Sequence, residues 1–336
     1  MPQLTMHVAT ETLRLAKPFR ISGHVFETSD IVIVTLDDGT HRGRGEGGGV
    51  FYRGDDVPHM TAALDGARAA IEAGPSREAL RSILPPGGAR NAVDCALWEL
   101  EAARAGQAVW ALAGQSRPKS LRTTFTLGAD DPEVMAQGAR DYADARSIKV
   151  KLTGDLDIDI ARVQAIRAAR PDVWLGVDGN QGFDISELDS LVSALHEANV
   201  SLLEQPLARG READLQSYKS IVPIAGDESL LSLDDIAGAV GRFEVVNIKL
   251  DKCGGLTEGL MMATEARRLG LGVMVGNMIG TSLAMAPAFV LGQLCDLVDL
   301  DGPTFLANDR TPSVTYTDGD IWAGPDVWGS GMASAT

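Results

Sequence analysis

The chain of 336 residues lacks the features of a membrane protein, a secreted protein or a nucleic-acid-binding protein. No apolar run approaches the roughly 18 residues that a membrane helix needs, and Met1–His7 has neither the basic start nor the apolar stretch of a signal peptide. Lys and Arg number 30 against 46 Asp and Glu, and phosphate binding needs clustered basic residues. We therefore expect a cytoplasmic protein with no membrane and no nucleic-acid partner.

Cysteine and histidine are also scarce. Cys95, Cys253 and Cys295 lie far apart in apolar surroundings, which indicates buried free thiols in a reducing compartment rather than a disulfide framework. Only five histidines occur, and no Ser-His-Asp set is readable among them. The last of them, His196, lies within an amphipathic helix pattern and is interpreted as a surface or packing residue.

The first third of the chain reads as strands followed by helices. Residues 1–55 alternate like antiparallel strands, most clearly at 31–36, and residues 57–115 read as helices. Around 114–119 the chain becomes polar and contains a proline. These patterns predict an N-terminal α+β domain over residues 1–118.

From about residue 122, short apolar runs alternate with amphipathic helix patterns, one of them at 184–200. The strand candidates are 122–127, 147–152, 173–178, 200–204, 222–226, 244–249, 271–276 and 296–300. Eight strands alternating with helices predict an α/β fold of the (β/α)8 TIM-barrel type over residues 119–304. The segment 305–336 contains two tryptophans and is predicted to pack back on the small domain.

Ionisable residues stand at the end of one predicted strand after another. They are Lys149, Lys151, Asp178, Glu204, Asp227 and Lys249. From Lys151 the steps are 27, 26, 23 and 22 residues, which is the length of one strand, helix and two loops. Charge recurring at the same end of successive parallel strands is typical of a barrel active site.

The three acids, Asp178, Glu204 and Asp227, indicate a metal site. Carboxylates on neighbouring strand ends would repel one another unless a cation lay among them, and oxygen-only ligands suit Mg²⁺, with Mn²⁺ as the alternative. No histidine lies near these motifs, which argues against zinc. The competing interpretation is that each acid merely starts a loop or caps a helix, and three acids in register make it the weaker one.

The lysines suggest proton transfer. Lys149 and Lys151 alternate with apolar residues, so both point to the same side of their strand. Two ammonium groups near a divalent cation lower each other's pKa, which predicts a neutral base near pH 7. Lys249 ends a strand four positions further around the ring and should approach from the opposite side. A carbon acid held between them could lose a proton on one face and regain it on the other, whereas the plainer interpretation is a pair of exposed lysines on a strand edge.

Two further motifs are open to two interpretations each. Asp299 and Asp301 close the eighth predicted strand and could hold a substrate ammonium group, or else be a capping and a turn residue before Gly-Pro. Residues 43–48 match a G-x-G-x-x-G pattern, but residues 50–55 do not start a helix. The dinucleotide-binding interpretation therefore fails.

Together, the Lys-x-Lys pair, the Asp/Glu/Asp set and the run from Asn247 to Gly255 resemble the enolase superfamily, in its muconate-lactonizing enzyme subgroup. The resemblance covers nearly the whole chain. Within the subgroup the chain looks most like the dipeptide epimerases, the group of the L-Ala-D/L-Glu epimerases, because Asp299 and Asp301 match the Asp-x-Asp of that group. Residues 84–98 resemble a helix of its capping domain, which makes the N-terminal α+β domain the capping domain of a modified barrel.

The resemblance implies a Mg²⁺-dependent isomerase that transfers the α-proton of the second residue of an L-Ala-X dipeptide through an enolate. The implied roles are metal binding by Asp178, Glu204 and Asp227, acid/base catalysis by Lys151 and Lys249 with Lys149 assisting, ammonium binding by Asp299 and Asp301, a substrate hydrogen bond from Thr124, and support of the ligands by Asn180 and Glu228. The late histidine of the mandelate racemase pattern is absent.

One departure concerns the substrate. The Ala-Glu epimerases place an Arg in a mobile N-terminal loop, and that position aligns with Phe26, near His24. An apolar residue there would leave a buried carboxylate unpaired. We therefore predict a neutral or hydrophobic second residue, unless Arg20 or Arg53 reaches a Glu side chain.

The alternatives reuse the same lysines and metal. They are an o-succinylbenzoate synthase, a muconate cycloisomerase and an N-succinylamino acid racemase, with a non-catalytic scaffold as a remote option. The substrate dipeptide, the pathway and the oligomeric state, including a homo-oligomer, are left open by the sequence.

Overall fold

Three antiparallel strands open the chain, as the alternating pattern predicts. The computed structural model describes residues 3–21 and 23–331. In it β1 (Thr5–Ile21), β2 (His24–Asp37) and β3 (Arg42–Gly48) form one sheet in sequence order. The helices α1 (Val57–Glu72), α2 (Arg77–Ile83), α3 (Gly88–Ala105) and α4 (Val109–Leu112) follow. The predicted order of strands and then helices is confirmed.

The glycines of residues 43–48 let helix α3 cross strand β3 backbone to backbone. A Cβ atom at Gly43, Gly45 or Gly47 would lie 2.0, 2.0 or 2.1 Å from the carbonyl oxygens of Ala96, Ala92 and Gly88, respectively. Every second residue of the strand thus contacts every fourth residue of the helix. These are the spacings at which residues of a strand and of a helix return to the same face. The G-x-G-x-x-G pattern is therefore a packing motif of the capping domain.

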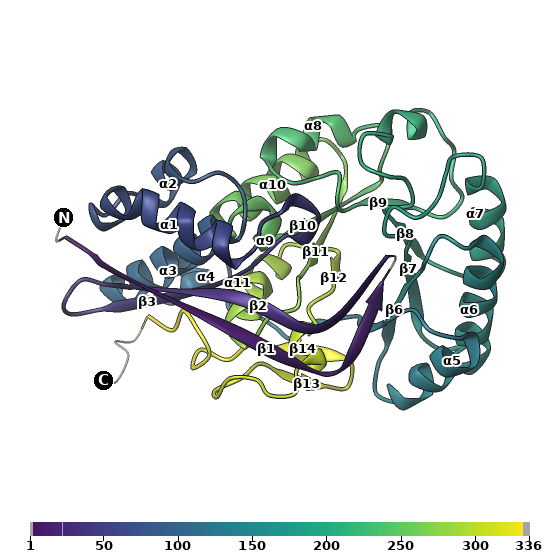
Figure 1. Ribbon diagram of the computed structural model, residues 1–336, viewed down its shortest axis with the longest axis horizontal. Helices are drawn as coiled ribbons and strands as arrows, with labels where there is room; N and C mark the ends of the chain where they lie inside the picture. Colours follow the sequence, from purple (N-terminus) through teal and green to yellow (C-terminus); the bar gives the residue numbers. More distant parts are fainter. Residues whose placement is uncertain (1–2, 22, 332–336) are drawn as a thin grey trace.

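The second part of the chain is an eight-stranded parallel sheet that curls into a barrel, which confirms the predicted fold class (Figure 1). Its strands are β5 (Phe125–Leu127), β6 (Ser147–Lys151), β7 (Trp174–Asp178), β8 (Leu202–Glu204), β9 (Ile224–Gly226), β10 (Val245–Lys249), β11 (Gly272–Gly276) and β12 (Leu297–Val298). The α-helices are α5 (Pro132–Asp141), α6 (Leu156–Ala169), α7 (Leu188–Glu197), α8 (Ile236–Ala239), α9 (Leu250–Cys253), α10 (Leu256–Arg268) and α11 (Ser282–Gly292).

The barrel departs from eight regular repeats in three places, one of them after β12, where the described residues form the 3-10 turn Gly302–Phe305 and two short strands but no α-helix. Between β8 and β9, residues 205–223 form only a 3-10 turn at Glu212–Leu215, with no α-helix. The predicted strand 122–127 is split, because β4 (Leu121–Arg122) pairs with β14 (Asp320–Trp322), and β14 in turn pairs with β13 (Thr315–Thr317).

Hydrogen bonds join the two ends of the barrel sheet. The amide of Thr124 donates to the Val298 carbonyl at 3.0 Å, and the Leu300 amide donates to the Thr123 hydroxyl at 2.9 Å. These bonds bring the end of β12 beside the start of β5. The residues that follow both strands therefore face the same barrel opening as the ends of β6 to β11.

The capping domain is fixed to the barrel by buried polar contacts. The Asp251 carboxylate, just after β10, accepts hydrogen bonds from the Gly48 amide and the Asn91 side chain, both at 2.8 Å. The β1–β2 hairpin reaches across the barrel toward β6, β7 and β8 (Figure 1), and the Phe19 ring near its tip packs on Phe305 at 4.6 Å between centroids. Sheet and hairpin together cover the barrel opening.

The C-terminal segment returns to the capping domain. Trp328 donates its indole hydrogen bond to the Arg44 carbonyl at 2.9 Å, and the Gly329 amide donates to Glu99 at 3.1 Å. The domain boundaries at 118/119 and 304/305 stay predictions. All three cysteines are free, Cys295 being less buried than the other two, and within the described ranges no helix has the length and apolarity to cross a membrane.

We expect the substitution Gly45→Ala to lower the free energy of unfolding by about 3 kcal/mol, because its methyl group would clash with the backbone of α3. Gly66→Ala is the matched control: Gly66 lies in α1 with nothing within 4 Å of the added Cβ, so this change should be neutral or stabilise by up to about 1 kcal/mol. Urea unfolding of both variants tests this, and equal effects would contradict the packing role of β3.

Candidate active site

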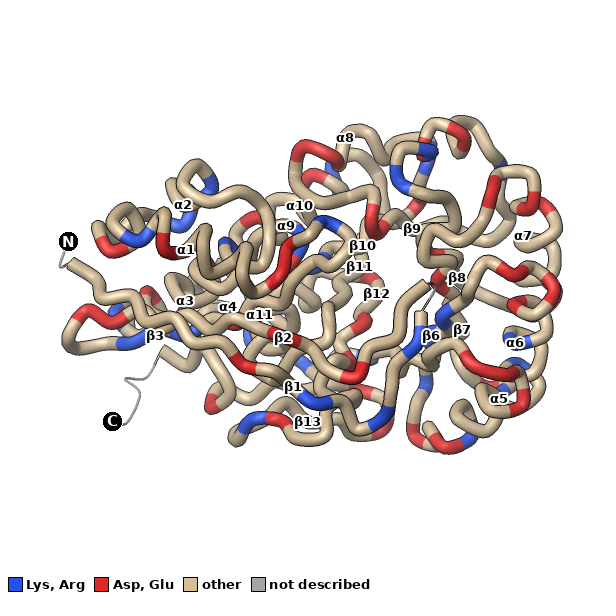
Figure 2. Tube along the Cα trace, in the orientation of Figure 1, with Lys and Arg blue, Asp and Glu red and all other residues tan. Residues whose placement is uncertain are grey.

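The strand register places the predicted acidic and basic residues side by side. Lys151 at the end of β6 pairs with Asp178 at the end of β7, and Asp178 pairs with Glu204 at the end of β8. Asp227 follows β9 directly. Because all these strands are parallel, their carboxyl ends meet at one opening of the barrel, where basic and acidic segments lie together around β6, β7 and β8 (Figure 2).

Asp178, Glu204 and Asp227 form a cluster that could hold a cation. One carboxylate oxygen from each lies within 4.8 Å of the other two, and the three side chains are almost fully buried. Buried carboxylates at this separation repel one another, and a set of oxygen donors alone is what Mg²⁺ prefers. The donor chemistry and the crowding therefore fit a hard divalent cation.

Each lysine of the site contacts a particular carboxylate. Lys151 lies 2.6 Å from Asp178, and Lys249 lies 2.6 Å from Asp227. Lys149 contacts Glu204 at 2.8 Å and is the most buried of the three. Lys151 and Lys249 thus approach the cluster from strands β6 and β10, between which β7, β8 and β9 lie.

The charges shift the pKa values of the acids in different directions. Burial raises the pKa of Glu204 to about 8, with the Asp178 charge adding to the effect. Burial also acts on Asp178, but Lys151 and Lys149 outweigh it and hold the pKa of this carboxyl at about 2. The cluster therefore holds one carboxyl group with a raised pKa beside one with a lowered pKa.

The charges also shift the pKa values of two of the lysines, Lys249 and Lys149. Burial lowers the pKa of Lys249, yet the charge of Asp227 and, more weakly, those of Glu204 and Asp178 outweigh it, so this pKa is raised. The pKa of Lys149 is raised in the same way, by Asp299, Glu204 and Asp178. The predicted lowering of the pKa within the pair Lys149 and Lys151 included a divalent cation beside them and stays a prediction.

A cavity of about 440 Å³ lies between the barrel opening and the capping domain. Its floor includes Lys151, Asn180, Asp227, Glu228 and Lys249, all of them predicted site residues. Apolar residues line much of the rest: Phe19, Ile21, Phe26, Phe51, Val57, Met278 and Ile279. The two lysines on this floor are the only basic residues among the described residues that line it.

The predicted ammonium-binding residues do not line this cavity. Asp299 accepts hydrogen bonds from Lys149 at 2.8 Å and from the Thr124 hydroxyl, and Asp301 accepts one from the Thr126 amide at 2.6 Å. Burial and the Asp299 charge raise the pKa of Asp301 to about 7. Thr124, Asp299 and Asp301 therefore form a cluster of their own at the junction of β5 and β12.

His24 also lies off the cavity wall. It is exposed at the hairpin tip, and its ring packs against Phe51 at 4.7 Å and Phe26 at 5.6 Å between centroids. Arg20 turns outward to Asp130 at 3.7 Å, and neither Arg20 nor Arg53 lines the cavity. Phe26 does line it, so the apolar side chain is the one that faces the cavity.

The remaining two predicted residues, Asn180 and Glu228, lie beside the acidic cluster. The Asn180 amide donates to Asp178 at 2.9 Å, and its side chain donates to Glu228 at 3.4 Å. Burial and the charges of Asp227 and Asp178 raise the pKa of Glu228 to about 7. Asn180 therefore joins Glu228 to Asp178, one of the acids that would bind the cation.

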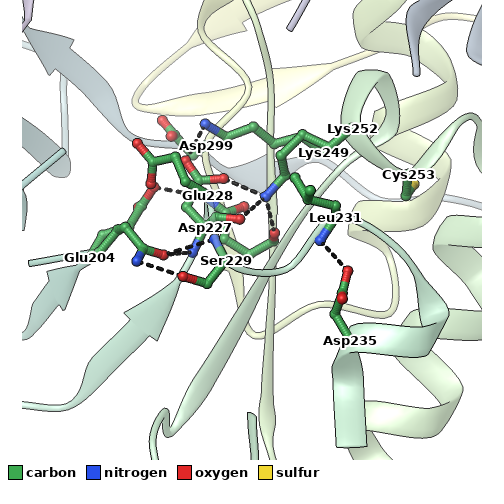
Figure 3. A network of polar contacts seen from close by, with 12 residues as sticks. Glu204, Asp227, Glu228, Ser229, Leu231, Asp235, Lys249, Lys252, Cys253 and Asp299 are labelled. Atoms are coloured by element: carbon green, nitrogen blue, oxygen red, sulfur yellow. Dashed lines mark hydrogen bonds and ion pairs between the residues drawn. The ribbon is translucent and has the colours of Figure 1, made fainter. Parts of the chain in front are cut away.

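Three residues were missed by the sequence analysis. Lys252 is fully buried and donates to the Asp227 carboxylate and to the carbonyls of Asp227 and Asn247; Figure 3 shows Lys249 and Lys252 converging on Asp227. Tyr52 and Asn277 line the cavity, and each has a buried polar atom without a hydrogen-bond partner. Lys252 lies within the run from Asn247 to Gly255 that the sequence analysis singled out, so its signal was readable, whereas the other two needed the tertiary structure.

Comparison with known proteins identifies two family models along the chain. Residues 3–114 match the model for the mandelate racemase/muconate lactonizing enzyme N-terminal domain, and residues 134–333 match the model described as enolase C-terminal domain-like. The L-Ala-D/L-Glu epimerase of Escherichia coli is 38% identical over 94% of this chain and 99% of its own length. An N-acetyl-D-glutamate racemase from Pseudoalteromonas is 40% identical over 72% of this chain and 76% of its own.

Solved structures resemble the chain over nearly its whole length. An enolase family member from Agrobacterium tumefaciens, with bound sodium and L-Ala-L-Glu, has a TM-score of 0.94 and 38% identity, covering 97% of this chain and all of its own. A dipeptide epimerase from Enterococcus faecalis, in complex with Mg and L-Leu-L-Tyr, has a TM-score of 0.91 and 28% identity, covering 98% and 99% of the two chains.

We expect Lys252→Met to lower the free energy of unfolding by about 3 kcal/mol, because it removes one of two ammonium groups from the buried Asp227 carboxylate. The control is Lys219→Met at an exposed position, which should change stability by less than about 0.5 kcal/mol. Urea unfolding measures both, and similar values for the two variants would show that the Lys252 contact does not stabilise the site.

Proposed function

The chain belongs to the mandelate racemase/muconate lactonizing enzyme family of the enolase superfamily, and on this premise we propose that it is a Mg²⁺-dependent dipeptide epimerase. The observation that carries the proposal is the pair of lysines, Lys151 and Lys249, that reach one buried acidic cluster from separate strands on the floor of a single cavity. Relatives over almost the whole chain carry the same activity. The reaction is inversion at the α-carbon of the second residue.

Asp178, Glu204 and Asp227 would hold the cation, since their buried oxygens are the donor set that Mg²⁺ takes. When bound there, Mg²⁺ supplies positive charge that favours the developing negative charge on the substrate carboxylate. Asn180 and Glu228 support the set: the Asn180 amide donates to Asp178, and its side chain donates to Glu228.

Proton transfer falls to Lys151 and Lys249. An α-carbon held between them presents one face to each Nζ atom, so that one lysine removes the proton and the other returns a proton to the opposite face. Lys149 lies two residues before Lys151 on the same strand. Its Nζ atom forms ion pairs with Glu204 and Asp299 at 2.8 Å each. It adds a fixed positive charge beneath the reacting carboxylate.

The cavity wall favours a neutral or hydrophobic second residue. Phe26 and Phe51 lie on it, and Asp30, Asp55 and Asp56 are its other charged lining residues outside the floor. A glutamate side chain would meet apolar rings and acids there, without a basic partner, which is costly for a buried charge. L-Ala-L-Phe and L-Ala-L-Leu are accordingly the substrates that we expect to react fastest.

Racemisation of N-acylated amino acids is the second candidate, favoured by the 40% identity to an N-acetyl-D-glutamate racemase. An N-acyl amino acid has the same reacting α-carbon and carboxylate, but it lacks the ammonium group. N-acetyl-L-phenylalanine and N-acetyl-L-glutamate therefore belong in the same assays. The cytoplasmic location and a homo-oligomeric state stay predictions.

In D₂O with Mg²⁺, we expect the enzyme to exchange the α-proton of L-Ala-L-Phe for deuterium while forming L-Ala-D-Phe, as followed by NMR. Lys151→Ala and Lys249→Ala should each lower epimerisation by about 10³-fold, because one face of the carbon loses its proton carrier. Each variant should keep exchange for only one of the two epimers, and the two variants should differ in which one. Lys219→Ala is the control, and near-native epimerisation by either active-site variant would refute the two-base mechanism.

The role of Phe26 is tested with Phe26→Arg. We expect the wild type to prefer L-Ala-L-Phe over L-Ala-L-Glu in kcat/KM, and the arginine to shift the ratio toward Glu by about 10- to 100-fold through a charged hydrogen bond. Val25→Arg adds the same charge at the preceding residue, which is 55% exposed and does not line the cavity, and should leave the ratio unchanged. A wild-type preference for L-Ala-L-Glu would contradict the specificity proposed here.

A further inference from the structure

Asn277 occupies a position between the proposed reaction centre and the acids at the end of β12. It directly follows Gly276, which pairs with Lys249 in the β10–β11 register. On its other side lies Gly302, where a Cβ atom would come within 3.2 Å of the Asn277 Nδ2 atom, and Gly302 follows Asp301. Asn277 therefore lines the cavity beside Lys249, whereas Asp301 does not line it.

In the side-chain amide of Asn277 the nitrogen has a hydrogen-bond partner and the oxygen has none among the described residues. Nδ2 donates to the Met278 carbonyl at 3.0 Å, which fixes the orientation of the amide. Oδ1 is buried and has no hydrogen-bond partner among the described residues, although Asn277 lines the cavity. A buried acceptor without a donor is costly, and polar atoms left in this state mark a place where a ligand group pairs.

The loop that carries Asn277 is held in place by the capping domain. The Ser29 hydroxyl of β2 donates to the Ile279 carbonyl at 2.9 Å, and the Thr281 amide donates to Glu46 of β3 at 2.7 Å. Both contacts join segments more than 200 residues apart in the chain. An acceptor on a segment held in this way is preorganised, so a ligand need not order it on binding.

We propose that Asn277 Oδ1 accepts a hydrogen bond from the peptide N–H of the substrate, and that the enzyme thereby selects amide-linked amino acids over ester-linked ones. The inference rests on the proposed function, because it takes the α-carbon to lie near Lys249. The peptide nitrogen is bonded to that α-carbon. Its N–H is therefore the substrate donor nearest to the end of β11, and Asn277 follows that end directly. A neutral carbonyl oxygen matches a neutral N–H, whereas the charged ammonium group at the far end of a dipeptide is better matched by carboxylates.

The test compares L-Ala-L-Phe with its depsipeptide, in which an ester oxygen replaces the peptide N–H. We expect the wild-type enzyme with Mg²⁺ to bind and exchange the peptide at least about 10-fold better than the ester, because the ester leaves Oδ1 unpaired. Asn277→Ala should weaken binding and exchange of the peptide by a similar factor and change those of the ester by less than about 2-fold. Calorimetric Kd values and α-deuterium exchange are measured for each of the four combinations.

Further variants separate recognition from packing. Asn277→Leu nearly keeps the volume and removes the acceptor, so it should reproduce the loss of discrimination even if Asn277→Ala is unstable. Met278→Leu changes the neighbouring side chain and leaves in place the Met278 carbonyl to which Nδ2 donates, so it should keep the wild-type ratio of peptide to ester. Thermal unfolding of each variant gives its stability independently.

The outcomes are distinct. Equal weakening of peptide and ester by the Asn277 variants, or a wild-type enzyme that does not discriminate between them, would overturn the role of Asn277 while exchange with the dipeptide still supports the epimerase. Absence of both binding and exchange for every dipeptide and N-acyl amino acid would overturn the proposed function and this inference with it.

Discussion

The rest of the structure depends on the mutual neutralisation of charges buried at the carboxyl ends of the barrel strands. Asp178, Glu204 and Asp227 are almost inaccessible to solvent, and lysines from β6, β10 and α9 contact them. Desolvating such groups is expensive, and well-packed apolar residues would often serve stability as well or better. The parallel sheet tolerates them because the register aligns each acid with its neighbours and because Asn247 and Lys149, on the same face, contact Glu204. The charges are thus explained by chemistry rather than by folding, and the fold supplies their positions.

The capping domain answers a different constraint, which is to cover this opening without filling it. Its helix α3 lies directly on β3, where alternating glycines remove the side chains that would separate them. That close contact brings Gly48 within 2.8 Å of Asp251, so the sheet ends at the barrel opening rather than above it. From the same sheet the β1–β2 hairpin extends over the strand ends, and its Phe26 ring packs on Phe51 at 5.4 Å between centroids. The cavity therefore has a polar floor from the barrel and a largely apolar wall, most of it from the capping domain.

The floor of the cavity was predictable from the sequence and its wall was not. A parallel barrel repeats one unit, so an ionisable residue at each strand end, at steps of 22 to 27 residues, is enough to infer that Lys151, Asp178, Glu204, Asp227 and Lys249 meet. The split of the segment 122–127 depends on a partner strand near residue 320, and no local pattern reports such a pairing. The absence of an α-helix between β8 and β9 could likewise not be predicted, because the spacing between strand ends gives the number of residues and not their conformation. Thr124, Asp299 and Asp301 lie in one cluster, as their positions at the junction of the barrel ends imply. The hydrogen bond from Lys149 to Asp299 could be recognised only from the folded structure.

Specificity in this architecture follows from which parts of the chain are free to change. Residues at strand ends are constrained by the register, because a one-residue slip would turn every inward side chain outward. The hairpin tip with Phe26 and the segment after β11 with Asn277 are loops or element ends, where a substitution alters the cavity wall and leaves the strand register intact. In the specificity that we propose, Phe26 withholds a partner from a charged side chain, whereas Asn277 offers an acceptor to a group that every amide-linked substrate carries. On this proposal, two opposite physical effects, exclusion at one end of the cavity and pairing near the reacting carbon, select the substrate without any change in the two lysines proposed to move the proton.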